Sequence, residues 1–201
     1  MFYRPEDGHG LPHNPFKAIV SPRPIAWIST RDLKGTPNLA PYSFFNAIAD
    51  TPPQVVFGST GAKDDQEESK DTVSNIRATG VFCINIVAEH LIDPMNASTA
   101  PLGKDVDEFQ VAGLAAVPCD SIDCMRVAEA PASLECKLSQ IIRLEGESNF
   151  MVIGKVTGIH MRDECIKGGR FDVTTYKPLA RLGYKDYSVV ETLFELERPS
   201  S

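Results

Sequence analysis

Aromatic and β-branched residues fill two neighbouring stretches of the chain, residues 23–30 and 38–46. Between them lie Asp32, Gly35 and Pro37, which are residues typical of turns. The pattern therefore predicts a β-hairpin with these two stretches as its arms.

Four further stretches have the composition of strands: residues 54–59, 81–87, 132–144 and 150–161. The stretch 81–87 is apolar on nearly both faces, which indicates a central strand. Turn-forming residues at 145–149 predict that the last two strands form a hairpin, and Gly154 and Gly158 indicate bends or a close backbone approach in the second of them.

One helix is predicted after the third strand. It opens at Lys70-Asp71-Thr72, with Asp71 as the expected N-cap, and stops at Gly80. About six strands and two or three short helices predict a mainly β fold. Closing an antiparallel sheet removes its exposed edges, so we expect a small antiparallel barrel.

The length of 201 residues fits a single domain over 1–201, with an N-terminal arm at 1–15 and a C-terminal tail at 188–201. The net charge of −7 repels nucleic acids and acidic membranes, and we expect neither as a partner. The N-terminus lacks the pattern of a secretory signal, and no apolar run approaches about 20 residues. We therefore expect a cytoplasmic protein.

Neither histidine nor cysteine spacing predicts a metal site. His9 and His13 lie among Gly and Pro residues that disfavour a helix, and no histidine pair accompanies Cys119 and Cys124. The five cysteines are odd in number and contain no Cys-x-x-Cys motif. Free, mostly buried thiols in a reducing compartment are the expected state.

The sequence contains none of the common nucleotide-binding, metalloprotease or serine-hydrolase motifs. His90 and His160 are lone histidines, which are more often structural than catalytic, so we interpret them as structural side chains. No residue is predicted to be catalytic, and any redox activity would come from a cofactor.

The hairpin carries small polar residues among large aromatic ones, a combination that suits a planar ligand with polar edges. The polar residues are Ser29, Thr30, Ser43 and Asn46, and the aromatic ones include Trp27 and Tyr42. An amphipathic hairpin at a sheet edge, without a ligand, explains the same residues.

Flavin mononucleotide (FMN) fits these parts. The hairpin could flank its ring with Trp27 and Tyr42. The helix opening at Lys70 and Thr72 could hold its phosphate together with Ser59 or Thr60, because unpaired amides at a helix N-terminus attract anions.

Four stretches resemble, in order, the flavin reductase-like proteins with the FMN-binding split-barrel fold: residues 23–30, 38–46, 70–76 and 178–184. The resemblance extends from about residue 16 to 187. It implies a homodimer of Greek-key split barrels, with FMN near the subunit interface and reduction by NADH or NADPH.

The resemblance also implies the site residues. Ser29, Thr30, Pro41, Tyr42, Ser43 and Asn46 would line the ring and ribityl chain; Ser59, Thr60, Lys70 and Thr72 would hold the phosphate; and Arg181 and Tyr184 would approach from the C-terminal segment. Members that act quickly on free flavin often carry a histidine followed by glycines near that last position. This chain has Leu182-Gly183-Tyr184 instead.

These observations favour an FMN-dependent oxidoreductase that passes hydride from NADH or NADPH to flavin. Oxygen, a partner oxygenase or a small acceptor would then take the electrons. Two alternatives stay open: an FMN-binding electron carrier without nicotinamide turnover, and a barrel that binds no flavin and serves as a scaffold.

Overall fold

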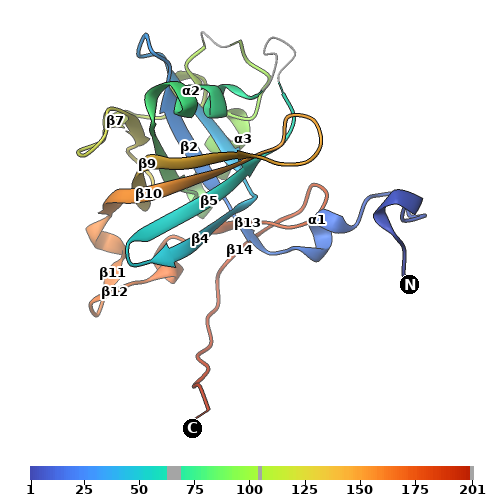
Figure 1. The fold of residues 1–201 in the computed structure, drawn as a ribbon. Coiled ribbons are helices and arrows are strands. Elements are labelled where there is room, and N and C mark those ends of the chain that lie inside the picture. The colour runs from blue at the N-terminus through green and yellow to red at the C-terminus, as the bar shows by residue number, and fades with distance from the viewer. Residues whose placement is uncertain (63–68, 104–105, 200–201) are drawn as a thin grey trace.

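The computed structural model describes residues 1–62, 69–103 and 106–199 (Figure 1). Its main sheet is antiparallel and has seven strands in the order β3-β2-β6-β9-β10-β5-β4. In chain order, these strands are β2 Ala26–Arg31, β3 Pro37–Tyr42, β4 Phe45–Asp50, β5 Pro53–Ser59, β6 Val81–Ile86, β9 Ala132–Arg143 and β10 Phe150–Met161. The predicted mainly β, antiparallel architecture is confirmed.

The sheet curls until its two ends meet. β3 and β4 lie at opposite ends of the strand order, yet Ser43 and Phe44 alone connect them. At this crossing the carbonyl of Phe44 accepts a hydrogen bond from the Gly58 N–H at 2.7 Å, and the ring centroids of Tyr42 and Phe57 are 5.1 Å apart. The result is a split barrel, and residues 42–44 are called the barrel junction below.

At the barrel junction the structure differs from the prediction of one continuous strand. The sequence suggests a single arm over 38–46, but the chain leaves β2 after Tyr42, and Asn46 pairs instead with Val56 of β5. All six predicted strands are present, and the seventh strand of the sheet arises from this division. Pro37 and Pro41 lie in β3, which is an edge strand and so tolerates their missing N–H groups.

The long hairpin of β9 and β10 is confirmed. Its pairing shifts register at Gly154 and again at Gly158, which marks the expected irregularities. A Cβ atom on Gly154 would lie 2.4 Å from the ring of Phe82, so the close approach predicted for this glycine is real.

The α-helices are α1 Phe16–Ile19, α2 Asp71–Thr79, α3 Ile92–Ala97 and α4 Glu108–Val111, and the 3-10 helices are η1 Pro5–Asp7, η2 Glu89–Leu91, η3 Asp163–Cys165 and η4 Val173–Thr175. The prediction of Asp71 as N-cap is wrong: Lys70 is the N-cap of α2, with extended dihedral angles and no capping side-chain bond. Asp71 is already helical, a position where the helix dipole favours an acid. Gly80 ends α2 in the left-handed conformation, as expected.

Short strands complete the described structure. β1 Arg23–Pro24, β13 Leu179–Arg181 and β14 Tyr187–Val189 form one small sheet; β7 Ala116–Pro118 pairs with β8 Met125–Val127, and β11 Ile166–Lys167 with β12 Arg170–Phe171. In the first of these sheets Arg23 lies directly opposite Arg181. This pairing attaches the C-terminal segment to the start of the predicted hairpin.

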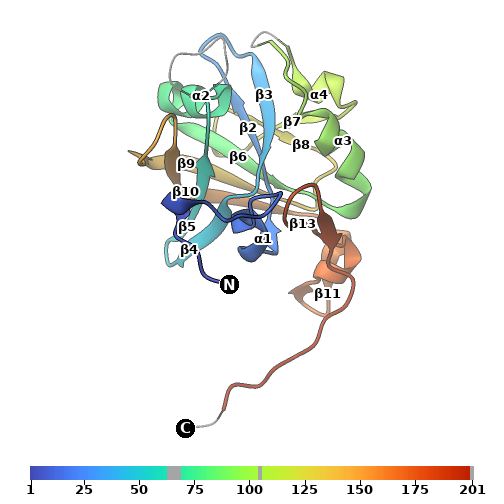
Figure 2. The same ribbon diagram turned by 90° about the vertical axis from the view of Figure 1, so that its right-hand side faces the viewer.

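The barrel core contains Ile28, Phe57 and Phe82, and Val73 and Ile76 of α2 pack against it. α2 thereby covers one end of the barrel (Figure 2). All five cysteines are free, and all except Cys119 are buried, as expected. In the described ranges, no helix is both long and apolar enough to span a membrane.

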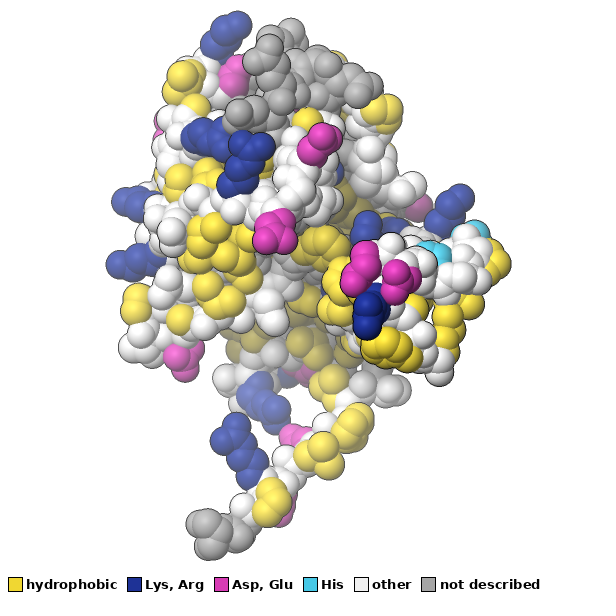
Figure 3. Space-filling model, turned by 45° about the vertical axis from the view of Figure 1, so that its right-hand side comes forward, with side chains coloured by type: hydrophobic (Ala, Val, Ile, Leu, Met, Phe, Trp, Pro, Cys, Tyr) yellow, Lys and Arg dark blue, Asp and Glu magenta, His cyan; other side chains and the backbone are white. Residues whose placement is uncertain are grey.

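Beyond β14 the chain runs away from the barrel (Figure 1). Leu193, Phe194 and Leu196 are exposed on this segment, and Figure 3 shows its row of hydrophobic side chains.

Candidate functional site

A cleft of about 980 Å³ opens beside the barrel junction. Three parts of the chain enclose it: the N-terminal segment, the barrel wall and the turn between β13 and β14. They contribute Pro12, His13, Asn14, Phe16, Lys17 and Arg23, then Pro41, Tyr42, Ser43, Phe44, Gly58, Thr60 and Lys70, and finally Arg181, Leu182, Tyr184, Lys185 and Asp186.

A smaller hollow of about 260 Å³ adjoins this cleft. Pro41, Tyr42 and Lys70 line both spaces, and Thr72 lines the smaller one. The side chains of Tyr42 and Lys70 therefore mark the point where the two spaces meet.

Two buried hydroxyl groups at this point have no hydrogen-bond partner in the described part of the chain. They belong to Tyr42, which is 7% exposed, and to Ser59, which is 1% exposed. Burial raises the pKa of Tyr42 to about 12, although the nearby hydroxyls of Thr72 and Ser59 favour its ionised form. A buried hydroxyl without a partner is costly, so the pair is suited to a polar group of a ligand.

The N-terminus of α2 provides positive potential beside these hydroxyls. Lys70 stands at the N-cap, and its Nζ lies 5.8 Å from the ring centroid of Tyr42. Burial lowers the pKa of Lys70, and the neighbouring charge of Lys17 lowers it further. A helix of nine residues, a lysine and two unpartnered hydroxyls together have the chemistry that suits an anion.

Most of the residues predicted from the sequence gather here. The cleft is lined by Pro41, Tyr42, Ser43, Thr60, Lys70, Arg181 and Tyr184, while Thr72 lines the smaller hollow. Ser59 lies close to the Tyr42 hydroxyl without lining either space.

Four predicted residues do not reach the cleft. Trp27 is fully buried, and its indole N–H donates to Ser98 at 2.9 Å. Ser29 donates to the carbonyl of Met125 at 2.6 Å. Asn46 is exposed on β4, where its side chain accepts a bond from the next backbone N–H.

Thr30 is the fourth, and it is connected to the site only through other side chains. Its hydroxyl oxygen accepts bonds from Asn38 at 3.3 Å and from Asn75 at 3.1 Å. Asn38 also donates to Thr72 at 3.1 Å. Thr30 thus helps to hold α2, and with it Thr72, against the hairpin.

The N-terminal side of the cleft was not predicted from the sequence. Lys17 and Arg23 line it, together with Phe44 of the junction. Lys17 stands inside a short apolar run, and Arg23 at the start of a predicted strand, so neither pattern indicated a ligand site. The sequence did offer one signal for this site: basic residues lie on both sides of the hairpin, with Lys17 before it and Lys70 after it.

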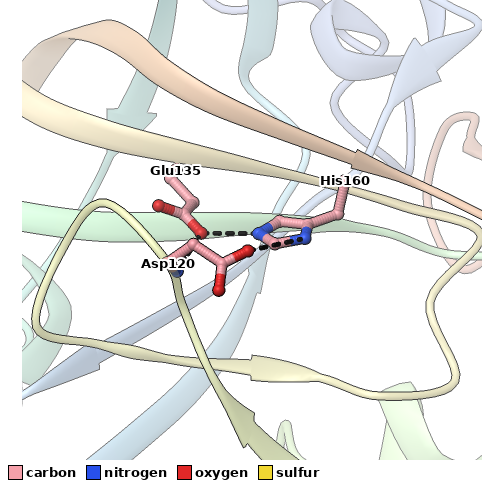
Figure 4. A group of neighbouring side chains, drawn as sticks. All are labelled: Asp120, Glu135 and His160. Carbon is pink, nitrogen blue, oxygen red and sulfur yellow. Dashed lines mark hydrogen bonds and ion pairs between the residues drawn. The ribbon is translucent and has the colours of Figure 1, made fainter.

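A separate group lies outside the cleft, where Glu135 of β9 and His160 of β10 meet Asp120 of the loop between β7 and β8 (Figure 4). The distance from His160 Nε2 to Glu135 Oε1 is 2.5 Å. Strand pairing, rather than sequence spacing, gives this histidine its carboxylate, because β9 and β10 are neighbours. The backbone N–H groups of Asp120 and Ser121 also donate to Glu135, at 2.7 and 2.6 Å.

This group has the ligand types of a metal site, with one atom of each residue within 4.8 Å of the others. However, hydrogen bonds already occupy both oxygens of Glu135. Burial alone would raise the pKa of Glu135, but the bonds from Ser121, His160 and the backbone outweigh it and lower the pKa to about 2. The group therefore fixes the loop at 120–121 to the sheet.

Comparisons with known proteins identify the relatives of this chain. A family model described as "Flavin reductase like domain" matches residues 20–183. An uncharacterized protein of Halalkalibacterium halodurans is 32% identical over 185 residues, which cover 90% of this chain and 88% of that protein.

Solved structures similar to this chain agree with the match to this family. Nitrilotriacetate monooxygenase component B from Bacillus cereus is 27% identical, with a TM-score of 0.88 and coverage of 98% of both chains. The 2-nitrobenzoate 2-nitroreductase from Pseudomonas fluorescens is 30% identical, with a TM-score of 0.80 and coverage of 92% of this chain and 88% of that one. The resemblance inferred from the sequence and the split-barrel fold are both confirmed.

We predict that Glu135→Gln lowers the free energy of unfolding at pH 7 by at least about 1.5 kcal/mol, since bonds to a charged acceptor are lost. The folded-state pKa of about 2 lies below the ordinary 4.5, so the carboxylate stabilises the fold fully above pH 4.5. That contribution disappears as the pH falls towards 2. Urea unfolding at pH 7, 4.5 and 3 should show a larger acid loss in the wild type than in the variant; equal losses would contradict the assignment.

Proposed function

The chain belongs to the flavin reductase-like domain family, and on that premise we propose that it is an FMN-binding oxidoreductase reduced by NADH or NADPH. The observation that carries the proposal is the pair of buried, unpartnered hydroxyls of Tyr42 and Ser59 beside Lys70 and the N-terminus of α2. A phosphate monoester supplies the acceptor oxygens and the negative charge that this group lacks.

The phosphate position assigns roles to the neighbouring residues. Lys70 and the first turn of α2 would bind the phosphate, with Tyr42 and Ser59 donating hydroxyl hydrogen bonds. Thr60 and Thr72 stand on either side and would complete the contacts. Because its pKa is about 12, Tyr42 keeps its proton at neutral pH and acts as a donor.

The flavin ring would extend from this point along the barrel junction. Pro41 and Ser43 line the cleft there, and so do Arg181 at the end of β13 and Tyr184 in the turn that follows. The bound flavin would supply the hydride acceptor and pass electrons onward. The protein's own part is binding, orientation and exclusion of water, so we propose no catalytic side chain.

The relatives support proposals about acceptors. The name of the Bacillus cereus protein, a monooxygenase component B, supports a partner oxygenase, and the Pseudomonas fluorescens nitroreductase supports a small acceptor. We propose residues 1–201 as a single domain that forms a homodimer; burial of the exposed Leu193, Phe194 and Leu196 would favour association. Five free thiols support a cytoplasmic location.

Lys70→Ala should weaken FMN binding about 10- to 100-fold, because a charge-assisted bond contributes roughly 1.5–3 kcal/mol. Riboflavin, which has no phosphate, should lose less than about threefold. Quenching of flavin fluorescence measures both dissociation constants. Lys155→Ala, an exposed lysine on β10, is the matched control. Equal losses for the two flavins would exclude Lys70 from the phosphate site.

Tyr42→Phe separates ligand binding from folding. Removing a buried hydroxyl without a partner should leave the thermal midpoint of the FMN-free protein unchanged or raise it. FMN affinity should fall about fivefold, the loss of one hydrogen bond of about 1 kcal/mol. A lower midpoint together with unchanged FMN affinity would show that the hydroxyl serves the fold alone.

The choice between a reductase and an electron carrier rests on the donor. In an anaerobic cuvette, NADH or NADPH should bleach the visible bands of the FMN-loaded protein within minutes. Free FMN at the same concentration controls for the uncatalysed reaction. Retained FMN that neither nucleotide bleaches would favour the carrier.

A further inference from the structure

The cleft has far more positive charge than one phosphate requires. Its lining includes the cations Lys17, Arg23, Lys70, Arg181 and Lys185, against the single carboxylate of Asp186. Among the described residues, none of the five pairs with an acidic side chain. In a chain of net charge −7, this concentration is a local feature of the site.

These cations form a continuous row along the cleft. Lys70 stands near Lys17, whose charge lowers the pKa of Lys70. Lys17 Nζ and the Arg23 guanidinium both face the ring of Phe44, at 5.7 and 5.8 Å from its centroid. Arg23 lies opposite Arg181 in the β1–β13 pairing. Like charges in such a row repel one another, so a bound polyanion would stabilise them.

Arg23 holds the backbone segments on both sides of this row of cations in place. It is 6% exposed, and its guanidinium donates to the carbonyls of Lys17, Val20 and Leu182. Its Nε is buried without a partner in the described chain. Arg23 thus connects the segment that carries Lys17 to the turn that carries Lys185, and it fixes both beside the cleft.

Charge counting indicates what the row accepts. An FMN phosphate carries about −1.5 to −2 and balances roughly half of the excess of four positive charges. A pyrophosphate bridge brings about two more negative charges, one on each phosphate, and balances the rest. FAD alone would bring only that pyrophosphate, which leaves the row half balanced.

We propose that Lys17, Arg181 and Lys185 form a second anion subsite, which binds the pyrophosphate of the nicotinamide dinucleotide while FMN occupies the Lys70 end of the cleft. The subsite rests on the proposed function, since it names where the electron donor of that reaction binds. Lys17 and Lys185 are exposed and can reach a ligand that enters from solvent.

The test uses ADP, the pyrophosphate-bearing part of the donor, as a probe in calorimetric titrations of the FMN-loaded protein. ADP should bind the wild type, and Lys17→Ala should weaken it about tenfold or more, with adenosine as the uncharged control ligand. FMN affinity should change less than about threefold. The KM for NADH should rise with kcat retained. Lys34→Ala, an exposed lysine outside the cleft, should change none of these values.

Three results would overturn the subsite. The first is ADP binding of equal strength in Lys17→Ala and wild type. The second is competition between ADP and FMN, which would mean a single anion position. The third is FAD binding that exceeds FMN binding tenfold in the wild type but not in Lys17→Ala, which would assign the row to a flavin dinucleotide. Failure of the wild type to bind FMN would overturn the proposed function instead, so the two claims fail separately.

Discussion

The crossing of the chain from β3 to β4 is the constraint on which the rest of the structure depends. Ser43 and Phe44 alone join strands at opposite ends of the sheet, so the sheet must curl until those ends meet. The same crossing turns Tyr42, Ser43 and Phe44 towards the cleft. One short connection therefore both brings the two ends of the sheet together and forms a wall of the candidate site.

The cleft beside this wall is lined by positively charged side chains. The N-terminal segment brings Lys17, the N-cap of α2 brings Lys70, and the end of β13 brings Arg181, although these residues lie far apart in the sequence. Arg23 holds the two terminal segments together through backbone carbonyls. The positive charge of the cleft is thus a product of tertiary structure, set within an acidic chain.

The sequence predicted much of the fold, because the strands at 81–87, 132–144 and 150–161 carry strong local patterns. It could not predict the division of 38–46, since both halves are extended and only their partners differ. Small polar side chains in β2 resemble ligand contacts in sequence, yet Ser29 donates to the backbone carbonyl of Met125. Pairing across the fold, which local sequence does not encode, also gave His160 its carboxylate.

The most direct measurement is a crystal structure of the protein with FMN bound. We expect the phosphate within hydrogen-bond distance of the Tyr42 and Ser59 hydroxyls, at the N-terminus of α2 and beside Lys70. The flavin ring should then lie against Pro41 and Ser43. A phosphate bound between Arg23 and Arg181, with both hydroxyls still unpartnered, would contradict the assignment of the site.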